Sequence, residues 1–239
     1  MTSKAIKLIS LLFCLLLLGR SLEAATIEFS EEELPSESVV PVLDSPLAVK
    51  NKLVKPKGRL ELGVNAGYII DEMFFNNVLW GTSVFYHSSD YKAWGIKYLG
   101  RMTGLSTYSE QFEGTSQGLD FNKAPAPGAM LLGSYRWTFL YGKLSFSKDL
   151  VLPTQFSLEF DLGVQQSGQQ NLPLTAAAIS HRLYMKRQFA LAATYRLLLY
   201  QMLDPVSADI GTGTTPSESD FSKKIQISQG LELGLSYLF

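Results

Sequence analysis

The sequence predicts an all-β fold: an eight-stranded antiparallel transmembrane β-barrel, an up-and-down meander, preceded by a signal peptide and a periplasmic linker. Apolar and polar residues alternate with a period of two in about eight long stretches, as in strands with two different faces. The chain starts with an export signal, and its last stretch alternates up to a terminal Phe. The expected organisation is residues 1–25, signal peptide; 26–57, linker; and 58–239, outer-membrane β-barrel.

Residues 1–25 have the parts of a secretory signal. Two lysines precede an apolar run over Leu8–Leu18, and small residues for cleavage follow at Ala24 and Ala25. The run is shorter than the about 20 apolar residues that a membrane-spanning helix needs. Cys14, in this signal, is the only cysteine, so no disulfide, thiol chemistry or cysteine metal site is expected in the exported chain.

The predicted linker, residues 26–57, has no persistent period. It carries an acidic run at Glu31–Glu33 and four prolines, which favour an extended segment. We interpret it as a plain tether, with a partner-binding arm or a plug as alternatives. The net charge of −1 and the lack of a basic cluster interleaved with aromatic residues predict no nucleic-acid partner.

The first four strands are predicted from alternation in which large apolar residues take one face and small or polar residues the other. Their expected ranges are Arg59–Ile70, Asn76–His87, Tyr91–Met102 and Ala129–Tyr141. In a membrane barrel the apolar face points to lipid. The outward set therefore includes Leu62, Tyr68, Trp80, Val84, Tyr86, Trp94, Ile96, Leu131 and Trp137, whose aromatic members suit interfacial girdles.

The last four strands are predicted over Thr154–Gln166, Leu172–Met185, Arg187–Met202 and Lys224–Phe239. The first of these has the cleanest alternation, with Phe160 and Leu162 opposite Glu159 and Asp161. The second is rich in alanine, and the third and fourth each place an apolar face opposite a small or polar one. Strands of this length can cross a tilted membrane wall.

The connections alternate in length, which supports the same fold. The third, Thr103–Gly128, and the seventh, Leu203–Ser222, are long and polar, whereas the second and sixth are very short. Outer-membrane barrels have long outer loops and short periplasmic turns. The fourth connection, Gly142–Pro153, is longer than this rule prefers, unless it extends the flanking strands.

The carboxyl-terminal strand resembles the last strand of bacterial outer-membrane β-barrels, which typically ends in Phe with apolar residues at alternate positions before it. Here the matching residues are Leu231, Leu233, Leu235, Tyr237 and Phe239. The resemblance implies that this ending is the signal read by the barrel-assembly machinery.

Four stretches resemble a family of small outer-membrane barrel proteins from predatory and gliding delta-type proteobacteria. They are Gly58–Leu62, Tyr141–Lys143, Phe160–Val164 and the Phe ending. The resemblance spans nearly all of the exported chain, although each motif is short. It implies the fold and an outer-membrane location, and some members of the family belong to envelope complexes for gliding or surface adhesion.

Alternation also predicts a polar network in the lumen. An eight-stranded barrel is just filled by its side chains, and charges enclosed there need partners. The expected members are Arg59, Glu61, Lys97, Arg101, Arg136, Glu159, Asp161, Arg182, Arg196 and Glu232, with Lys224 also facing inward. Glu61 and Glu232 lie on strands that meet on closure, with Arg59 and Arg182 at a similar height. The main interpretation is a salt-bridged plug; a basic excess leaves a narrow conductive path or anion site as the alternative.

Catalysis is not expected. The pairs Ser180–His181 and His87–Ser88 supply residue types for a lipid-modifying enzyme, but adjacent strand residues point to opposite faces. A glycine-rich stretch from Gly211 is too short for phosphate binding. The acidic residues of the seventh connection, Asp204, Asp209, Glu218 and Asp220, lack metal-loop spacing, so neither a metal nor a cofactor is expected.

The expected function is that of an outer-membrane barrel with a structural or surface-interaction role, a component of an envelope assembly of the gliding or adhesion type that the family resemblance implies. Expected partners are membrane lipid and lipopolysaccharide, the barrel-assembly machinery and other envelope proteins. A small channel is the alternative, and a lipid A-modifying enzyme is the third candidate.

Overall fold

A computed structural model gives the structure of this 239-residue chain. It describes residues 52–113, 119–145, 147, 150–211 and 216–239. The described residues all belong to one compact unit of the chain, Ala48–Phe239. The predicted signal peptide and residues 26–51 of the predicted linker lie outside the described residues.

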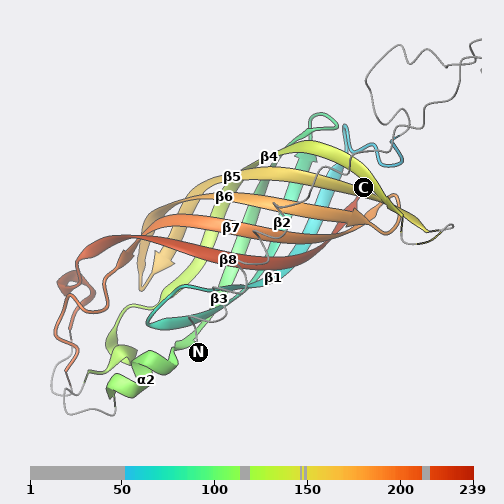
Figure 1. Ribbon diagram of the computed structural model, residues 1–239. Coiled ribbons are helices and arrows are strands. Elements are labelled where there is room, and N and C mark those ends of the chain that lie inside the picture. The colour runs from blue at the N-terminus through green and yellow to red at the C-terminus, as the bar shows by residue number, and fades with distance from the viewer. Residues whose placement is uncertain (1–51, 114–118, 146, 148–149, 212–215) are drawn as a thin grey trace, which may run out of the picture. The chain divides into compact units, whose positions relative to one another are not determined.

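Eight strands close into one barrel, in which each strand is antiparallel to the next and β8 returns to β1 (Figure 1). The predicted fold class is therefore confirmed. Closure satisfies the backbone groups of the wall within the ring. The strands are β1 (Leu60–Ile69), β2 (Phe75–His87), β3 (Lys92–Leu105), β4 (Pro127–Ser145), β5 (Val151–Ser167), β6 (Gln170–Tyr184), β7 (Phe189–Leu203) and β8 (Lys223–Leu238).

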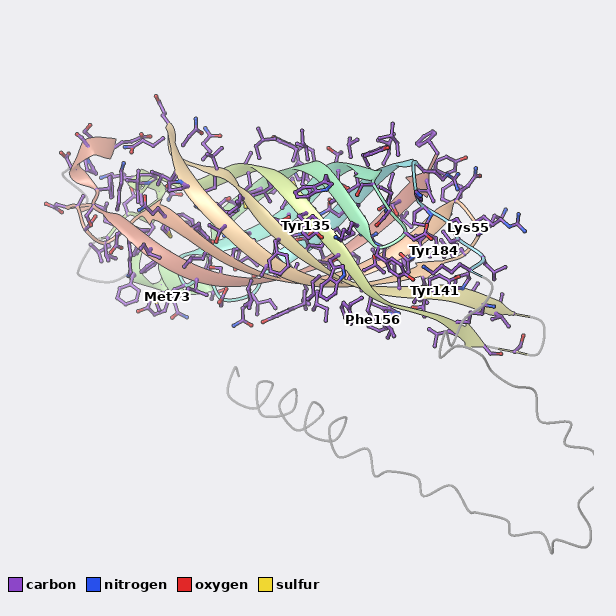
Figure 2. The ribbon with its side chains drawn as sticks, turned by 90° about the horizontal axis from the view of Figure 1, so that it is seen from above. Lys55, Met73, Tyr135, Tyr141, Phe156 and Tyr184 are labelled. Atoms are coloured by element: carbon purple, nitrogen blue, oxygen red, sulfur yellow. The ribbon has the colours of Figure 1, made fainter. Side chains whose placement is uncertain are left out.

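The two faces of the wall are reversed relative to a water-soluble protein. Ile227, which points out of the barrel, is 67% exposed, whereas the inward-pointing Arg196 is 1% exposed. Large apolar side chains surround the wall, as Tyr135 and Phe156 illustrate (Figure 2). An apolar outside around a buried polar inside is the arrangement of a transmembrane β-barrel.

The barrel has two unlike ends. The turn end carries the start of β1, the end of β8 and the short β2–β3 and β6–β7 turns; the loop end carries the two long connections (Figure 1). Lys55, Tyr141 and Tyr184 lie at the turn end, and Met73 lies at the loop end (Figure 2). This sorting of connection lengths agrees with the predicted one.

The fourth connection is shorter than predicted. β4 and β5 remain paired as far as Ser145 opposite Val151, so residues 146–150 replace the expected connection Gly142–Pro153. A register shift between Thr138 and Leu140 allows the two strands to continue past the last β3 partner, at Trp137. The long connection expected at the turn end is therefore absent, whereas at the loop end the β5–β6 connection is limited to residues 168–169.

The third connection is more structured than predicted. It contains helix α2 (Thr107–Glu113), whose first turn is capped because Ser106 accepts a hydrogen bond from the backbone N–H of Ser109 at 3.2 Å. It also contains a short 3₁₀ helix, Phe121–Lys123, capped by the side chain of Asp120. β3 extends to Leu105 and β4 begins at Pro127, so both strands include residues that were expected in the loop Thr103–Gly128. No helix among the described residues has the length and apolarity needed to span a membrane.

Candidate functional site: the layered lumen

The two long connections fold onto each other across the loop end. Leu119 forms a β-bridge with Gly211, and the backbone N–H of Asp120 donates to the carbonyl of Ile210 at 2.9 Å. Beneath them lies an apolar cluster formed by Phe75, Phe121, Ala124, Leu172, Leu203, Ile210 and Phe221. We call the described residues of these two connections, together with this cluster, the loop-end lid.

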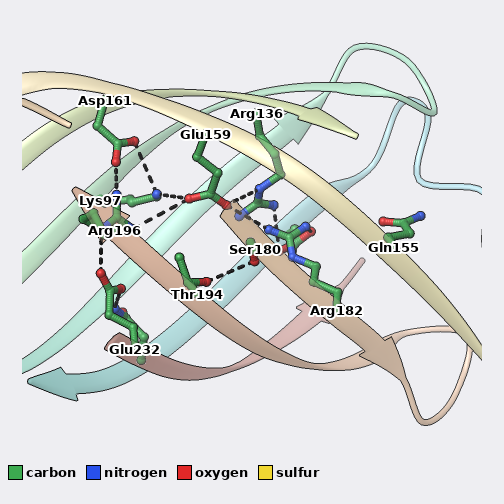
Figure 3. A network of polar contacts seen from close by, with 12 residues as sticks. Lys97, Arg136, Gln155, Glu159, Asp161, Ser180, Arg182, Thr194, Arg196 and Glu232 are labelled. Carbon is green, nitrogen blue, oxygen red and sulfur yellow. Dashed lines mark hydrogen bonds and ion pairs between the residues drawn. The ribbon is translucent and has the colours of Figure 1, made fainter. Parts of the chain in front are cut away.

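A charged layer occupies the lumen nearer the turn end (Figure 3). Glu159 on β5 is its centre. Its Oε1 atom accepts from Nε of Arg136 at 2.8 Å and from Nη2 of Arg182 at 3.2 Å. Its Oε2 atom contacts the ammonium of Lys97 and lies 3.7 Å from Nη2 of Arg196. Four cations from four strands thus converge on one carboxylate.

Glu61 extends the charged layer towards the turn end. It accepts from Nη1 of Arg136 at 3.1 Å and from Nη1 of Arg182 at 3.4 Å. Arg136 binds Oε1 of Glu61, whereas Arg182 and His87 share Oε2, with Nε2 of His87 at 2.9 Å. The guanidinium of Arg136 also stacks on Phe85, 3.6 Å from the ring centroid, a cation–π contact in a site without bulk water.

Asp161 and Glu232 complete the charged layer on its other side. Nζ of Lys97 lies 3.3 Å from Asp161, and Arg196 bridges Asp161 and Glu232, donating from Nε to Glu232 at 2.5 Å. The second oxygen of Glu232 accepts from Nδ2 of Asn65 at 2.6 Å. Each carboxylate in the layer therefore has more than one donor.

The charged layer is balanced. Its four carboxylates are those of Glu61, Glu159, Asp161 and Glu232, and its four basic side chains are those of Lys97, Arg136, Arg182 and Arg196. Buried charges are costly unless their partners and hydrogen bonds are complete. A balanced, mutually bonded set leaves no surplus charge to attract an ion, which removes the basic excess expected from the sequence.

An apolar layer lies between the charged layer and the loop end. Its members are Ile69, Leu79, Leu99, Met130, Leu132, Leu174, Ala176, Leu198, Tyr200 and Met202. Four of them (Leu79, Leu99, Leu132 and Leu198) have no exposed surface. Apart from the Tyr200 hydroxyl, the side chains of this layer offer no polar group to hold a column of water.

A second, smaller polar group adjoins the apolar layer, since Arg101 lies opposite Leu79 in the strand register and Tyr200 belongs to both. Nη1 of Arg101 donates to Glu72 at 3.1 Å, and its Nη2 donates to Oε1 of Gln165, also at 3.1 Å. The hydroxyl of Tyr200 and the amide of Asn77 both donate to Glu72. Arg101 is therefore a lumen residue, as predicted, but it belongs to a separate group from the charged layer.

A segment ahead of β1 closes the turn end. Val54 is 1% exposed and packs against Tyr184, Ala190 and Leu238 inside the mouth. We call residues 52–58 the strap. It is fixed by hydrogen bonds from Leu53 N–H to the hydroxyl of Tyr141 at 3.0 Å and from Gly58 N–H to the carbonyl of His87 at 2.8 Å. These contacts hold the described end of the predicted linker at the turn-end mouth; whether residues 26–57 serve as a tether, an arm or a plug stays a prediction.

Two predicted lumen residues lie elsewhere. Arg59 does not reach Glu61; its guanidinium donates to the carbonyl oxygens of Phe239 at 2.7 Å and Leu238 at 2.9 Å. It sits at the rim, where the strand has not yet entered the lumen. The Lys224 side chain is 61% exposed, 3.7 Å from Asp204, because β8 begins outside the barrel at that level. The other predicted members face the lumen.

Several residues that line the lumen were not among those predicted to do so. His87 follows the inward alternation of β2 (Leu79, Phe85) and is 4% exposed, so strand parity alone could have placed it. Glu72 lies in the β1–β2 connection, where alternation gives no direction. No sequence signal points to Val54, because the strap has no period.

The predicted assembly-signal residues all lie on the outer side of β8 or at its end. Leu231, Leu233, Leu235 and Phe239 are exposed, and Tyr237 packs between Phe189 and Phe239 with ring centroids 4.8 and 4.6 Å away. Their recognition by the barrel-assembly machinery stays a prediction.

The residue pairs considered for catalysis are separated as alternation predicts. Ser180 is buried in the lumen and accepts a hydrogen bond from Thr194 at 3.0 Å, whereas His181 stacks on the outward-facing Phe156 and lies 2.6 Å from the hydroxyl of Thr154. A lumen cavity of about 50 Å³ beside Ser180, Thr194 and the charged layer has room for a few water molecules. Among the described residues, no group of three or more His, Cys, Asp or Glu is arranged to hold a metal ion.

No protein-family model matches the chain, and no curated protein matches it. Among solved structures, it is similar to a chain described as "De novo design of transmembrane beta-barrels", with 15% sequence identity and a TM-score of 0.36. The alignment covers 77% of this chain and 97% of that chain. The fold described above rests on the strand pairing of the chain itself.

Proposed function

We propose that this protein is a non-conducting outer-membrane β-barrel with a structural or surface-interaction role. The observation that carries the proposal is that the lumen is occupied at every level. The strap, the charged layer, the apolar layer and the loop-end lid follow one another from the turn end to the loop end. A barrel filled in this way offers its ends and its outer wall, and not its interior, to other molecules.

The turn end faces the periplasm and the loop end faces the cell surface in this proposal. Short turns and long loops have these positions in outer-membrane barrels. The apolar outer wall supports contact with membrane lipid and, on the surface side, with lipopolysaccharide. The ending Leu231–Phe239 supports insertion by the barrel-assembly machinery.

Membership of a larger envelope assembly, of the gliding or adhesion type, follows from the family resemblance in the sequence. The loop-end lid is the candidate contact surface for such a partner. It exposes apolar side chains that lie beyond the wall, including Val206 at 53% and Tyr108 at 45% exposure. Apolar groups gathered on a surface loop favour contact with another protein.

The alternatives have less support. Charge balance in the lumen removes the reason for an anion path. For the lipid-modifying enzyme, Ser180 and His181 point to opposite sides of the wall, and His87 and Ser88 have other partners in Glu61 and the carbonyl of Lys92. We therefore propose that the barrel has no catalytic role.

Two measurements on the purified exported chain test the proposal. First, a shift of the electrophoretic band on boiling reports a closed membrane barrel. Second, recordings in planar bilayers report conduction, and we expect no resolved channel steps from protein that shows the shift. Steps from the shifted form would overturn the non-conducting role, whereas an unshifted protein recovered from the soluble periplasm would overturn the membrane location.

A further inference from the structure

Exposed cations gather at the turn end. Six belong to the strap, the short turns or the adjoining strand ends: Lys55, Lys57, Lys92, Lys143, Lys186 and Arg187. In the described part of these segments the only acidic side chain is Asp90, which Lys52 approaches at 3.7 Å. None of the six has an ion pair with another described residue. We call this set the basic rim.

The loop end has the opposite charge. Its connections carry Asp71, Glu110, Asp120, Asp204, Asp209, Glu218 and Asp220, against Lys123, Lys223 and Lys224. The formal charge of the whole chain is −1, so the basic rim does not reflect a basic protein. The exposed cations of the basic rim are therefore concentrated at the turn end of the barrel.

The basic rim lies at the level of exposed aromatic side chains. Lys92 is adjacent to Tyr91, shares the outward face of β3 with Trp94, and is opposite Trp137 in the register with β4. Tyr91, Trp94 and Trp137 are 46%, 59% and 43% exposed. Aromatic side chains of membrane proteins prefer the depth of the lipid headgroups, so the cations beside them lie at headgroup depth too.

We propose that the basic rim binds the anionic headgroups of phospholipids in the periplasmic leaflet. The inference rests on the membrane location proposed above and adds the chemistry of the lipid. The cations come from the strap, the β2–β3 and β6–β7 turns and the β4–β5 hairpin (Figure 1). A ring of charges around the mouth matches a surrounding annulus of lipid, whereas a single acidic partner protein would need them on one side. Lys and Arg close to an anionic membrane surface are attracted to it, and salt weakens the attraction.

The three tryptophans allow the lipid that contacts each level of the barrel to be identified separately. Trp94 and Trp137 lie near the basic rim, whereas Trp80 lies nearer the loop end of β2. In W80F the remaining tryptophans, Trp94 and Trp137, report on lipid at the basic rim. In W94F/W137F the remaining Trp80 reports on lipid away from it. Each exported chain is folded into vesicles of 70% phosphatidylcholine and 30% phosphatidylglycerol. Bromine on the acyl chains of one lipid or the other quenches only the tryptophans that this lipid touches.

In W80F, we expect phosphatidylglycerol to contact the tryptophans roughly twofold more often than its share of the vesicle, and 0.5 M salt to remove this excess. Adding K92Q/K143Q to W80F should remove most of this excess of phosphatidylglycerol contacts. The matched control is K223Q/K224Q, which removes two lysines at the loop end and should leave it unchanged. W94F/W137F should show no excess.

Equal quenching by the two brominated lipids in W80F would overturn the inference and leave an acidic periplasmic partner as the explanation of the basic rim. An excess that K92Q/K143Q does not reduce would also overturn it. The proposed membrane location fails in a different way: neither lipid quenches any tryptophan, and the band does not shift on boiling.

Discussion

The charged and apolar layers are neighbours in one lumen and fill it by different means. In the charged layer, Glu159 contacts four cations, so its geometry depends on every partner being present. In the apolar layer, the contacts are non-directional, so neighbouring side chains can fill part of the space that a truncated side chain leaves. We therefore expect the folded barrel to be more sensitive to substitutions in the charged layer than to substitutions in the apolar layer. The following changes test that contrast, in order of expected effect.

Removing the central carboxylate should have the largest effect. Glu159→Leu leaves Lys97, Arg136 and Arg182 buried without this partner, and breaking such a network costs about 3–5 kcal/mol. The free energy of unfolding in lipid vesicles, from urea titration followed by the boiling shift, measures the loss. Glu159→Gln keeps the shape and a hydrogen-bond acceptor and should cost less. A loss from Glu159→Leu no larger than that of Glu159→Gln contradicts the account.

Truncation in the apolar layer should cost less. Leu132→Ala opens a cavity in a fully buried position, with an expected loss of about 2–4 kcal/mol. The preceding residue supplies a matched control, because Leu131 points outward and is 53% exposed. Lipid can fill the space that Leu131→Ala leaves, so the same urea titration should show a smaller loss. Equal losses at the two positions would mean that position 132 is not packed as described.

The strap tests whether the turn end is closed in solution. The only natural cysteine, Cys14, lies in the predicted signal, so single cysteines can be introduced into the exported chain. We expect V54C to react with a maleimide on the order of tenfold more slowly than L53C, because Val54 is 1% and Leu53 44% exposed. Val54→Ser should destabilise the barrel by about 1 kcal/mol through lost apolar burial. Similar labelling rates would show that the strap does not stay in the mouth.

The smallest effect is expected at the exposed pair of Lys224 and Asp204, 3.7 Å apart. Lys224→Gln should change the free energy of unfolding by less than about 0.5 kcal/mol, because water and salt screen exposed ion pairs. Arg182→Gln is the contrast within the lumen, where Glu61 and Glu159 would both lose a donor. If the two substitutions had equal effects, burial would not govern the strength of these ion pairs.

The sequence predicted the strands and their faces well, since alternation is a local property. It placed Glu61, Lys97, Arg136, Glu159 and Arg196 in the lumen before their partners were known. The strand boundaries were predicted less accurately, because most of the expected connection Gly142–Pro153 extends β4 and β5, beyond a register shift between Thr138 and Leu140. The helix α2 was missed because a single Ser-capped turn in a polar segment gives only a weak signal.

The sequence by itself determined which residues can face lipid and which can face the lumen, because a strand turns successive side chains to opposite sides. Only the tertiary structure decided which charges meet. Arg59 and Arg182 were both placed near Glu61, but the stagger of the closed ring brings Arg182 to within 3.4 Å and sends Arg59 to the carbonyl of Phe239. Closure also put Val54 in the turn-end mouth and joined the two long connections over the loop end. These contacts link segments far apart in the chain, and their geometry depends on strand tilt and stagger, which no local pattern specifies.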